Sequence, residues 1–151
     1  MSDPVALHSQ SVRYAFPLLH PAQAQKEFTV NEAVARLDAL VHPGVIGLAD
    51  IPPTQPATGD AYLIGNTPEG EWSGMPDAIA VWQGDQWLIQ PPVTGMSIYR
   101  EDLGQMAHFR DVWRVAAMPA PIEGGTVKDN EARAAIEALV AILQKAGILP
   151  G

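Results

Sequence analysis

The sequence contains no cysteine, which excludes a disulfide-stapled scaffold, a thiol nucleophile and a cysteine-ligated metal centre. It is also poor in basic residues, with 9 Lys and Arg against 17 Asp and Glu and a formal net charge of −8. Proteins that bind nucleic-acid phosphates or anionic membrane surfaces need the opposite balance. No apolar run reaches the length of about 18 residues that a membrane-spanning helix requires. The first residues lack the basic and apolar regions of a secretory signal. We therefore expect no nucleic-acid partner, no membrane insertion and no signal peptide.

The motifs of common active sites are missing as well. The 4 histidines are scattered and show no metal-site spacing, and there is no nucleophile elbow, phosphate-binding loop or dinucleotide fingerprint. Neighbouring carboxylates, such as Glu101 and Asp102, lie in predicted turns. Solvated loop acids explain them better than a glycosidase pair does. We predict no catalytic residues, no metal and no cofactor.

Hydrophobic residues make up 47% of the chain, enough for a core, and clusters of its 14 prolines and 13 glycines divide it into three parts. We predict an N-terminal arm, helix and proline-rich connector over 1–59, a small β domain over 60–117, and a linker with a C-terminal helix over 118–151. The predicted fold class is α+β, with an antiparallel, Trp-containing β domain and a C-terminal oligomerising helix.

The first helix is predicted over residues 22–41, which contain neither glycine nor proline. Apolar residues recur there at spacings of four, three and four, so they form one stripe along the helix. These residues are Val30, Val34, Leu37 and Val41. We expect the stripe to pack against the β domain or a neighbouring subunit. After the helix, the prolines of residues 43–59 predict an extended connector that lies over a surface.

Short strands separated by turns are predicted in the β domain, with two hairpins among them. Residues 80–87 and 107–113 share the order aromatic residue, turn, tryptophan, a weak internal echo that indicates one small meander of hairpins. The predicted strands are 61–64, 79–82, 87–89, 95–99, 105–109 and 112–115.

Aromatic residues are concentrated on these strands, and exposed rings commonly stack on the apolar faces of sugars. Core packing is the alternative for each ring, because a small sheet needs large side chains to fill its core. Trp82 and Trp87 flank a turn, so one ring can be buried while the other is exposed. The candidates for glycan stacking are Trp72, Trp82, Trp87 and Tyr99.

The C-terminal helix is predicted to begin at Asp129 or Asn130 and to end at Ala146, before Gly147. Its apolar residues follow a heptad spacing, and Ala135, Val140 and Ile142 widen the stripe beyond what a two-stranded coil needs. One interpretation is an amphipathic helix packed on its own domain. The other, favoured by the Pro/Gly tether, is a short parallel bundle and most naturally a trimer. The predicted oligomer interface consists of Ala132, Ile136, Leu139, Leu143 and Ala146.

The segment Phe16 to Val41 resembles the N-terminal signature of a family of unknown function. That family occurs in fibre and spike proteins of tailed bacteriophages and of the gene transfer agents of alphaproteobacteria. Its P-x-Q-A-Q-K, N-E-A and L-D-A-L runs are matched here from Pro21 to Leu40. Residues 52–87 and the final helix resemble later blocks of the same family.

The resemblance implies a non-enzymatic spike or fibre-base protein that joins a phage-like or gene transfer agent particle to a host-binding element. The implied partners are further copies of the chain and other capsid, spike or tail proteins. The implied location is the virion or gene transfer agent particle, assembled in the bacterial cytoplasm. The alternative is a carbohydrate-binding module that itself contacts host surface polysaccharide. An enzyme whose site is not evident in the sequence is a third reading.

Overall fold

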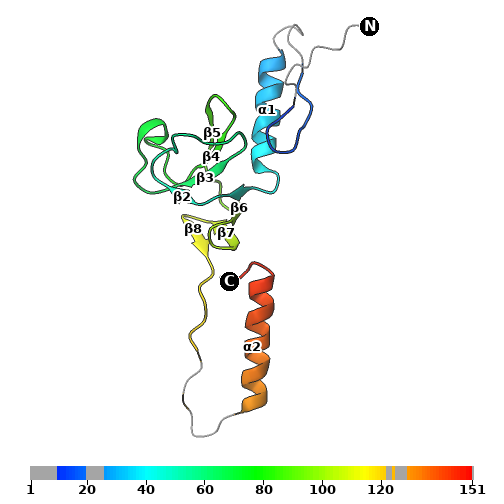
Figure 1. Cartoon of the computed structure of the whole chain (residues 1–151), viewed down its shortest axis with the longest axis vertical. Coiled ribbons are helices and arrows are strands. Elements are labelled where there is room, and N and C mark those ends of the chain that lie inside the picture. The colour runs from blue at the N-terminus through cyan, green and yellow to red at the C-terminus, as the bar shows by residue number, and fades with distance from the viewer. Residues whose placement is uncertain (1–9, 20–25, 122–123, 125–128, 151) are drawn as a thin grey trace.

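The structure is a computed structural model that describes residues 10–19, 26–121, 124 and 129–150. A central β region carries helix α1 at one end, and helix α2 projects from the other (Figure 1). This arrangement confirms the α+β class. The elements are α1 (Lys26–Leu40), β1 (Gly44–Val45), β2 (Leu48–Ala49), β3 (Ala61–Ile64), the short 3-10 turn η1 (Gly70–Trp72), β4 (Ile79–Trp82), β5 (Trp87–Gln90), β6 (Ser97–Arg100), β7 (Gln105–Phe109), β8 (Trp113–Val115) and α2 (Asn130–Lys145).

The β region consists of two four-stranded sheets with the same topology. One has the order β2-β3-β4-β5 and the other β1-β6-β7-β8, and each starts with a short parallel strand followed by an antiparallel meander. The last hairpin of each sheet carries a cross-strand aromatic pair. Trp82 and Trp87 have ring centroids 5.0 Å apart at 56°, and Phe109 and Trp113 have centroids 5.2 Å apart at 57°. The sequence echo therefore marks equivalent hairpins in two sheets, where the sequence analysis expected one meander.

The first part of the proline-rich connector contributes a strand to each sheet. Val45 in β1 is fully buried, Ile46 donates its N–H to Ala61 O at 2.8 Å, and Leu63 donates to Gly47 O at 2.9 Å. The expected connector over a surface is thus correct only for its later residues. Two-residue strands carry no hydrophobic period of their own, so pattern reading does not reveal them.

The main core lies between the two sheets, where strand side chains alternate inward. Ala39 and the half-buried Leu40, at the end of α1, close one side of this core. Its fully or almost fully buried members are Ala39, Val45, Ala61, Leu63, Ile79, Val81, Ile98 and Ala107.

A second, smaller core covers the other face of the β3–β4 pair. Trp72, brought there by η1, is fully buried against Ile64, Ala78 and Ala80. Trp87 is half-buried and packs on Trp72, with ring centroids 5.0 Å apart at 77°. The sheet that contains β3 and β4 is therefore packed on both faces, which explains why its two central strands are almost continuously apolar.

The N-terminal arm is fastened to α1 by the buried carboxylate of Asp38. This carboxylate accepts hydrogen bonds from Ser11 Oγ at 2.6 Å, from the Arg13 N–H at 2.9 Å and from the Tyr14 N–H at 2.7 Å. The Arg13 guanidinium in turn donates to Ala39 O at the end of α1 at 3.3 Å. The arm thus covers one side of α1 and satisfies a carbonyl at its carboxyl end.

Helix α2 is attached to the β domain through its carboxyl end. Asp129 caps its start by accepting the Ala132 N–H at 2.9 Å. Its end has the hydrogen bonds of a Schellman motif around Gly147, whose φ of 68° favours glycine. Gly147 O then accepts the N–H of Met106 in β7 at 2.8 Å, at the edge of β7 that pairs with β8 farther along. Leu149, two residues later, is buried. The carboxyl end of α2 therefore lies at the β domain, and its amino end is the part farthest from that domain (Figure 1). Within the described residues, neither helix is long and apolar enough to cross a membrane.

Candidate functional site

Helix α2 buries none of its residues within the chain. Leu139 is 55% exposed, Ile142 62% and Ile136 45%, while Leu143 is half-buried near the attached end. Ala132 and Ala146 are exposed as well. Four residues of the predicted interface therefore lie on a helix that its own β domain leaves largely uncovered, and the fifth, Ala146, is the C-cap of that helix. The flanking Ile142 is the most exposed large apolar residue on α2.

One flank of α2 is partly covered by the preceding linker, which runs back along the helix (Figure 1). Gln144 Nε2 lies 3.9 Å from Met118 Sδ, near the attached end. Farther along, Pro119 and Pro121 face Ile136 and Val140 across a groove of about 400 Å³. We call this space the linker groove. Ile136 thus borders both the linker groove and the open face of the helix.

The apolar stripe of α1 is also open. Val30 is 41% exposed and Leu37 58%, whereas Val34 and Val41 are half-buried. The structure describes α1 from Lys26, so residues 22–25 of the predicted helix lie outside the described residues, and Val41 follows the helix. Ala39 and Leu40, and not the predicted stripe, pack against the β core. The expectation that the β domain covers the stripe is wrong, because the arm held by Asp38 and the sheets occupy other sides of α1. The neighbouring-subunit alternative stays a prediction.

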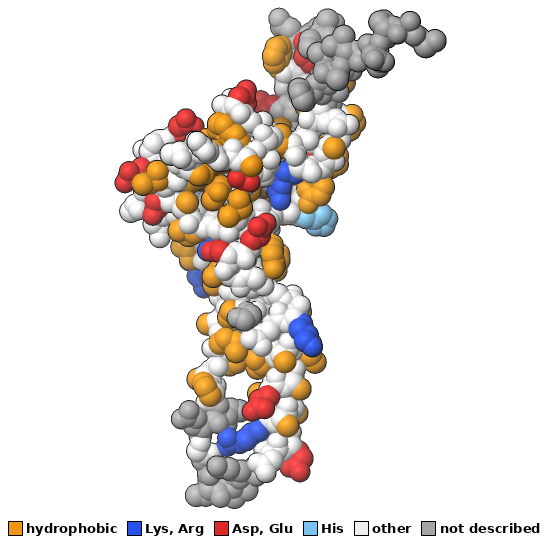
Figure 2. Space-filling view, viewed as in Figure 1, with side chains coloured by type: hydrophobic (Ala, Val, Ile, Leu, Met, Phe, Trp, Pro, Cys, Tyr) orange, Lys and Arg blue, Asp and Glu red, His pale blue; other side chains and the backbone are white. Residues whose placement is uncertain are grey.

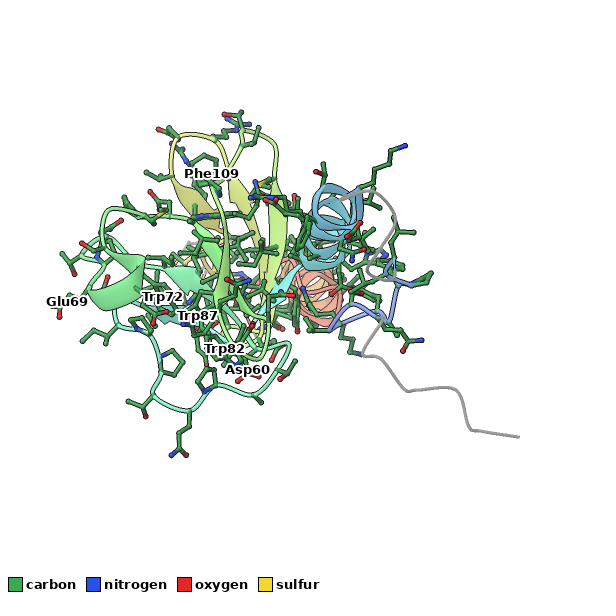
Figure 3. All side chains as sticks on the ribbon, turned by 90° about the horizontal axis from the view of Figure 1, so that it is seen from above. Asp60, Glu69, Trp72, Trp82, Trp87 and Phe109 are labelled. Atoms are coloured by element: carbon green, nitrogen blue, oxygen red, sulfur yellow. The ribbon has the colours of Figure 1, made fainter. Side chains whose placement is uncertain are left out.

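The two helices lie at opposite ends of the β region, and both are displaced toward the same flank of it. Figure 1 shows them one above the other along the long dimension of the molecule, and Figure 3 shows both nearly end-on at the same side. Figure 2 shows apolar side chains on both helices along this side.

A second hollow lies between the later residues of the connector and the aromatic hairpin β4–β5. Its volume is about 420 Å³, and Trp82 and Trp87 form one wall while the prolines of the connector form another. Glu71 adds a carboxylate to the lining and Thr54 contributes a second polar side chain. We call this hollow the aromatic groove; its labelled tryptophans are seen in Figure 3.

The two tryptophans are neighbours on one face of the sheet, because Trp82 and Trp87 are directly paired across β4 and β5. The idea that one ring is buried and the other exposed is therefore wrong, since both are half-buried. Trp72 is fully buried and presents no ring face to a ligand, which removes it from the candidates for glycan stacking. Tyr99 is 41% exposed but belongs to the other sheet, beside Gly147, and does not join the aromatic groove.

Charged side chains line both grooves, Arg133 and Glu137 the linker groove and Glu71 the aromatic groove. Burial, together with the nearby Asp60 carboxylate, raises the pKa of Tyr62. A side-chain hydrogen bond from Arg100 is the main cause that lowers the pKa of Asp102, in the turn between β6 and β7. Neither group lines the aromatic groove or the linker groove. Among the described residues, no group of three or more His, Asp or Glu side chains is placed to hold a metal ion.

Sequence reasoning missed two contributors to these surfaces. The role of the connector prolines as a wall of the aromatic groove depends on a contact with residues about 30 positions later, which local patterns do not encode. The return of the linker along α2 depends on the attachment of Gly147 to β7. The proline-rich composition of both segments is the one signal that points to extended chain packed on a surface.

The chain belongs to a family described as "Protein of unknown function (DUF2793)", whose profile matches residues 30–114. The matched region runs from within α1 to within β8 and thus includes both sheets, while α2 lies outside it. The resemblance to a family of unknown function is confirmed to this extent. No curated protein and no solved structure matches the chain.

Proposed function

We propose that the protein is a non-enzymatic structural component of a phage-like or gene transfer agent particle, a spike or fibre base that links the particle to a host-binding element. In this proposal it assembles in the bacterial cytoplasm as a homotrimer and joins other capsid, spike or tail proteins. The proposal is supported by the resemblance of residues 16–41 to fibre and spike proteins. The observation that carries it is the projecting, uncovered helix α2.

The physical argument starts from the length and exposure of α2. Its 16 residues would be marginally stable as an isolated helix in water, because helices of about 12–15 residues need tertiary packing. Among the described residues, α2 is contacted by the linker along one flank and held at its end by the attachment at Gly147. Copies of the same helix, packed on the heptad positions, are the simplest cover for the remaining apolar face.

The trimer is tested by light scattering on the purified chain and on Leu139→Asp. We expect a trimer for the parent and a monomer for the variant, because three carboxylates near one axis cannot be desolvated in so short a bundle. Val93→Asp is the matched control, since Val93 is 61% exposed but lies in the loop between β5 and β6. A parent that is monomeric at high micromolar concentration contradicts the trimer.

The particle assignment needs a separate experiment. Particles produced by the source cells are purified, and the protein is traced with an epitope tag by immunoblot and by imaging of labelled particles. We expect the protein to co-purify with capsid or tail proteins in particle fractions. A protein found only in the free soluble fraction, in cells that produce particles, refutes the assignment.

The aromatic groove favours a second candidate function, binding of host surface polysaccharide. The two half-buried tryptophans, with Glu71 and Thr54 beside them, combine apolar ring faces with polar groups that hydrogen-bond hydroxyls. A glycan array with the isolated chain tests this candidate, and Trp82→Ala is expected to abolish any signal. Phe109→Ala, at the equivalent position of the other sheet, is the control that leaves it unchanged. An array without binding to the parent eliminates the candidate.

A further inference from the structure

The heptad spacing of α2 gives its two flanks different neighbours in a parallel bundle. The core positions of a heptad are called a and d, and the residue just before an a position is a g position. Ala135 and Ile142 are the g positions of α2. The residue just after a d position is an e position, and Arg133 and Val140 are the e positions of α2. In a parallel bundle the g flank of one helix lies beside the e flank of the next.

The structure shows that these flanks also differ in shape. On the e flank, Val140 borders the linker groove, whose opposite wall is formed by Met118, Pro119 and Pro121. On the g flank, Ile142 is 62% exposed and no part of the described chain covers it. One flank thus presents a mainly apolar hollow, whose lining also includes the charged residues Arg133 and Glu137, and the other presents an apolar side chain.

We propose that the linker groove is a docking site for a second copy of this chain, and that Ile142 of one copy inserts into the linker groove of the next at its Val140 end. The proposal rests on the proposed trimer and names the contact that closes it. Because donor and acceptor are different surfaces, the contact is heterologous and closes into a ring when each copy uses both. The linker is then part of the interface as well as a tether.

The available area supports the participation of the linker. A helix of 16 residues is about 24 Å long, so a face about 10 Å wide offers roughly 240 Å². Stable interfaces bury about 800 Å² per partner. The core positions of α2 alone fall short of this value. Exposed apolar residues that enlarge the contact are Met118 in the linker and, at the attached end of α2, Tyr99 and Ile148.

The absence of cysteine from the sequence makes a direct test by disulfide cross-linking possible. In the double variant Met118→Cys/Ile142→Cys, a disulfide within one chain is not expected. Met118 lies beside Gln144, and positions 142 and 144 are about 200° apart around the helix. We therefore expect mild oxidation to give covalent dimers and a closed trimer on non-reducing gels. The controls are each single variant and Val93→Cys/Ile142→Cys, in which Val93 is an exposed residue of the loop between β5 and β6 and does not line the linker groove.

The outcomes separate this contact from the trimer itself. A trimeric parent whose double variant gives no more cross-linked species than the single variants overturns the groove contact and leaves the trimer standing. Cross-linking of Ile142→Cys alone into dimers, as efficient as in the double variant, indicates a symmetric contact and overturns it too. A monomeric parent overturns both. Capture of another particle protein by the groove would appear as a parent trimer with no 118–142 linkage.

Discussion

Replacement of Asp38 should loosen the N-terminal arm and destabilise the whole chain. Asp38 is 1% exposed and accepts hydrogen bonds from Ser11, Arg13 and Tyr14 at 2.6 to 2.9 Å. Hydrogen bonds to a charged group contribute about 1.5–3 kcal/mol each, and a buried donor left without a partner costs about 1–3 kcal/mol. Because the backbone donors are only part-buried, water compensates some of this loss. We expect Asp38→Ala to lower the free energy of unfolding by about 3–5 kcal/mol.

Urea denaturation followed by tryptophan fluorescence measures this change. With a slope of about 2 kcal/mol per molar urea, the midpoint should fall by about 1.5–2.5 M. All variants are compared at one protein concentration, because association shifts apparent stability. Asp38→Asn keeps the shape but turns one acceptor into a donor opposite a backbone N–H, so it should recover little of the loss. Asp60→Ala is the control, since the Asp60 carboxylate accepts a single exposed N–H, that of Ala57.

The result also decides why Asp38 stands in the L-D-A-L run of residues 37–40. If the free energy of unfolding of Asp38→Ala lies within about 0.5 kcal/mol of the parent value, the reasoning from the arm contacts is refuted. A ligand or partner contact would then be the better explanation of this carboxylate.

Three further predictions concern the core, the α1 stripe and pH. Trp72→Ala should cost about 3–5 kcal/mol in urea denaturation, and Trp72→Phe clearly less because the indole N–H has no partner among the described residues; equal losses would count against this packing. Leu37→Ser should raise the dissociation constant of the oligomer about tenfold in sedimentation at unchanged subunit stability, whereas Phe28→Ser, on the opposite side of α1, should not. Arg100 lowers the pKa of Asp102 below its ordinary 3.8, so this pair stabilises the fold above about pH 4 and the stability is lost as the pH falls through the lowered pKa. Asp102→Asn should therefore flatten the acid side of the stability profile, and an unchanged profile would contradict the assignment.

Local signals predicted the regular elements well. The heptad spacing and the caps at Asp129 and Gly147 located α2, and turn residues located the hairpins at 83–86 and 101–104. These features depend on residues a few positions apart. The burial of Trp72 was not predicted, since it depends on a 3-10 turn that folds back over β3 and β4.

The candidate surfaces were predicted as residue sets but not as shapes. The heptad spacing placed Leu139 in the predicted oligomer interface, and its side chain is 55% exposed in the chain, yet the spacing gave no hint that the linker lies along the Val140 flank. The aromatic pattern named Trp82 and Trp87, but only strand register shows that they share one face. Long-range register and the return of irregular chain are set by packing among distant residues, which one sequence does not display.

Both helices carry exposed apolar residues, but they are held to the rest of the chain in different ways. Helix α1 is anchored by a buried carboxylate and by Ala39 in the core, so it is stable within the chain even though Leu37 remains exposed. Helix α2 has no such anchor along its length, and its attachment at Gly147 fixes one end only. In the proposed trimer, the order of α2 therefore depends more strongly on neighbouring copies than that of α1. Dissociation should then unwind α2 from its amino end first, while the two sheets stay folded.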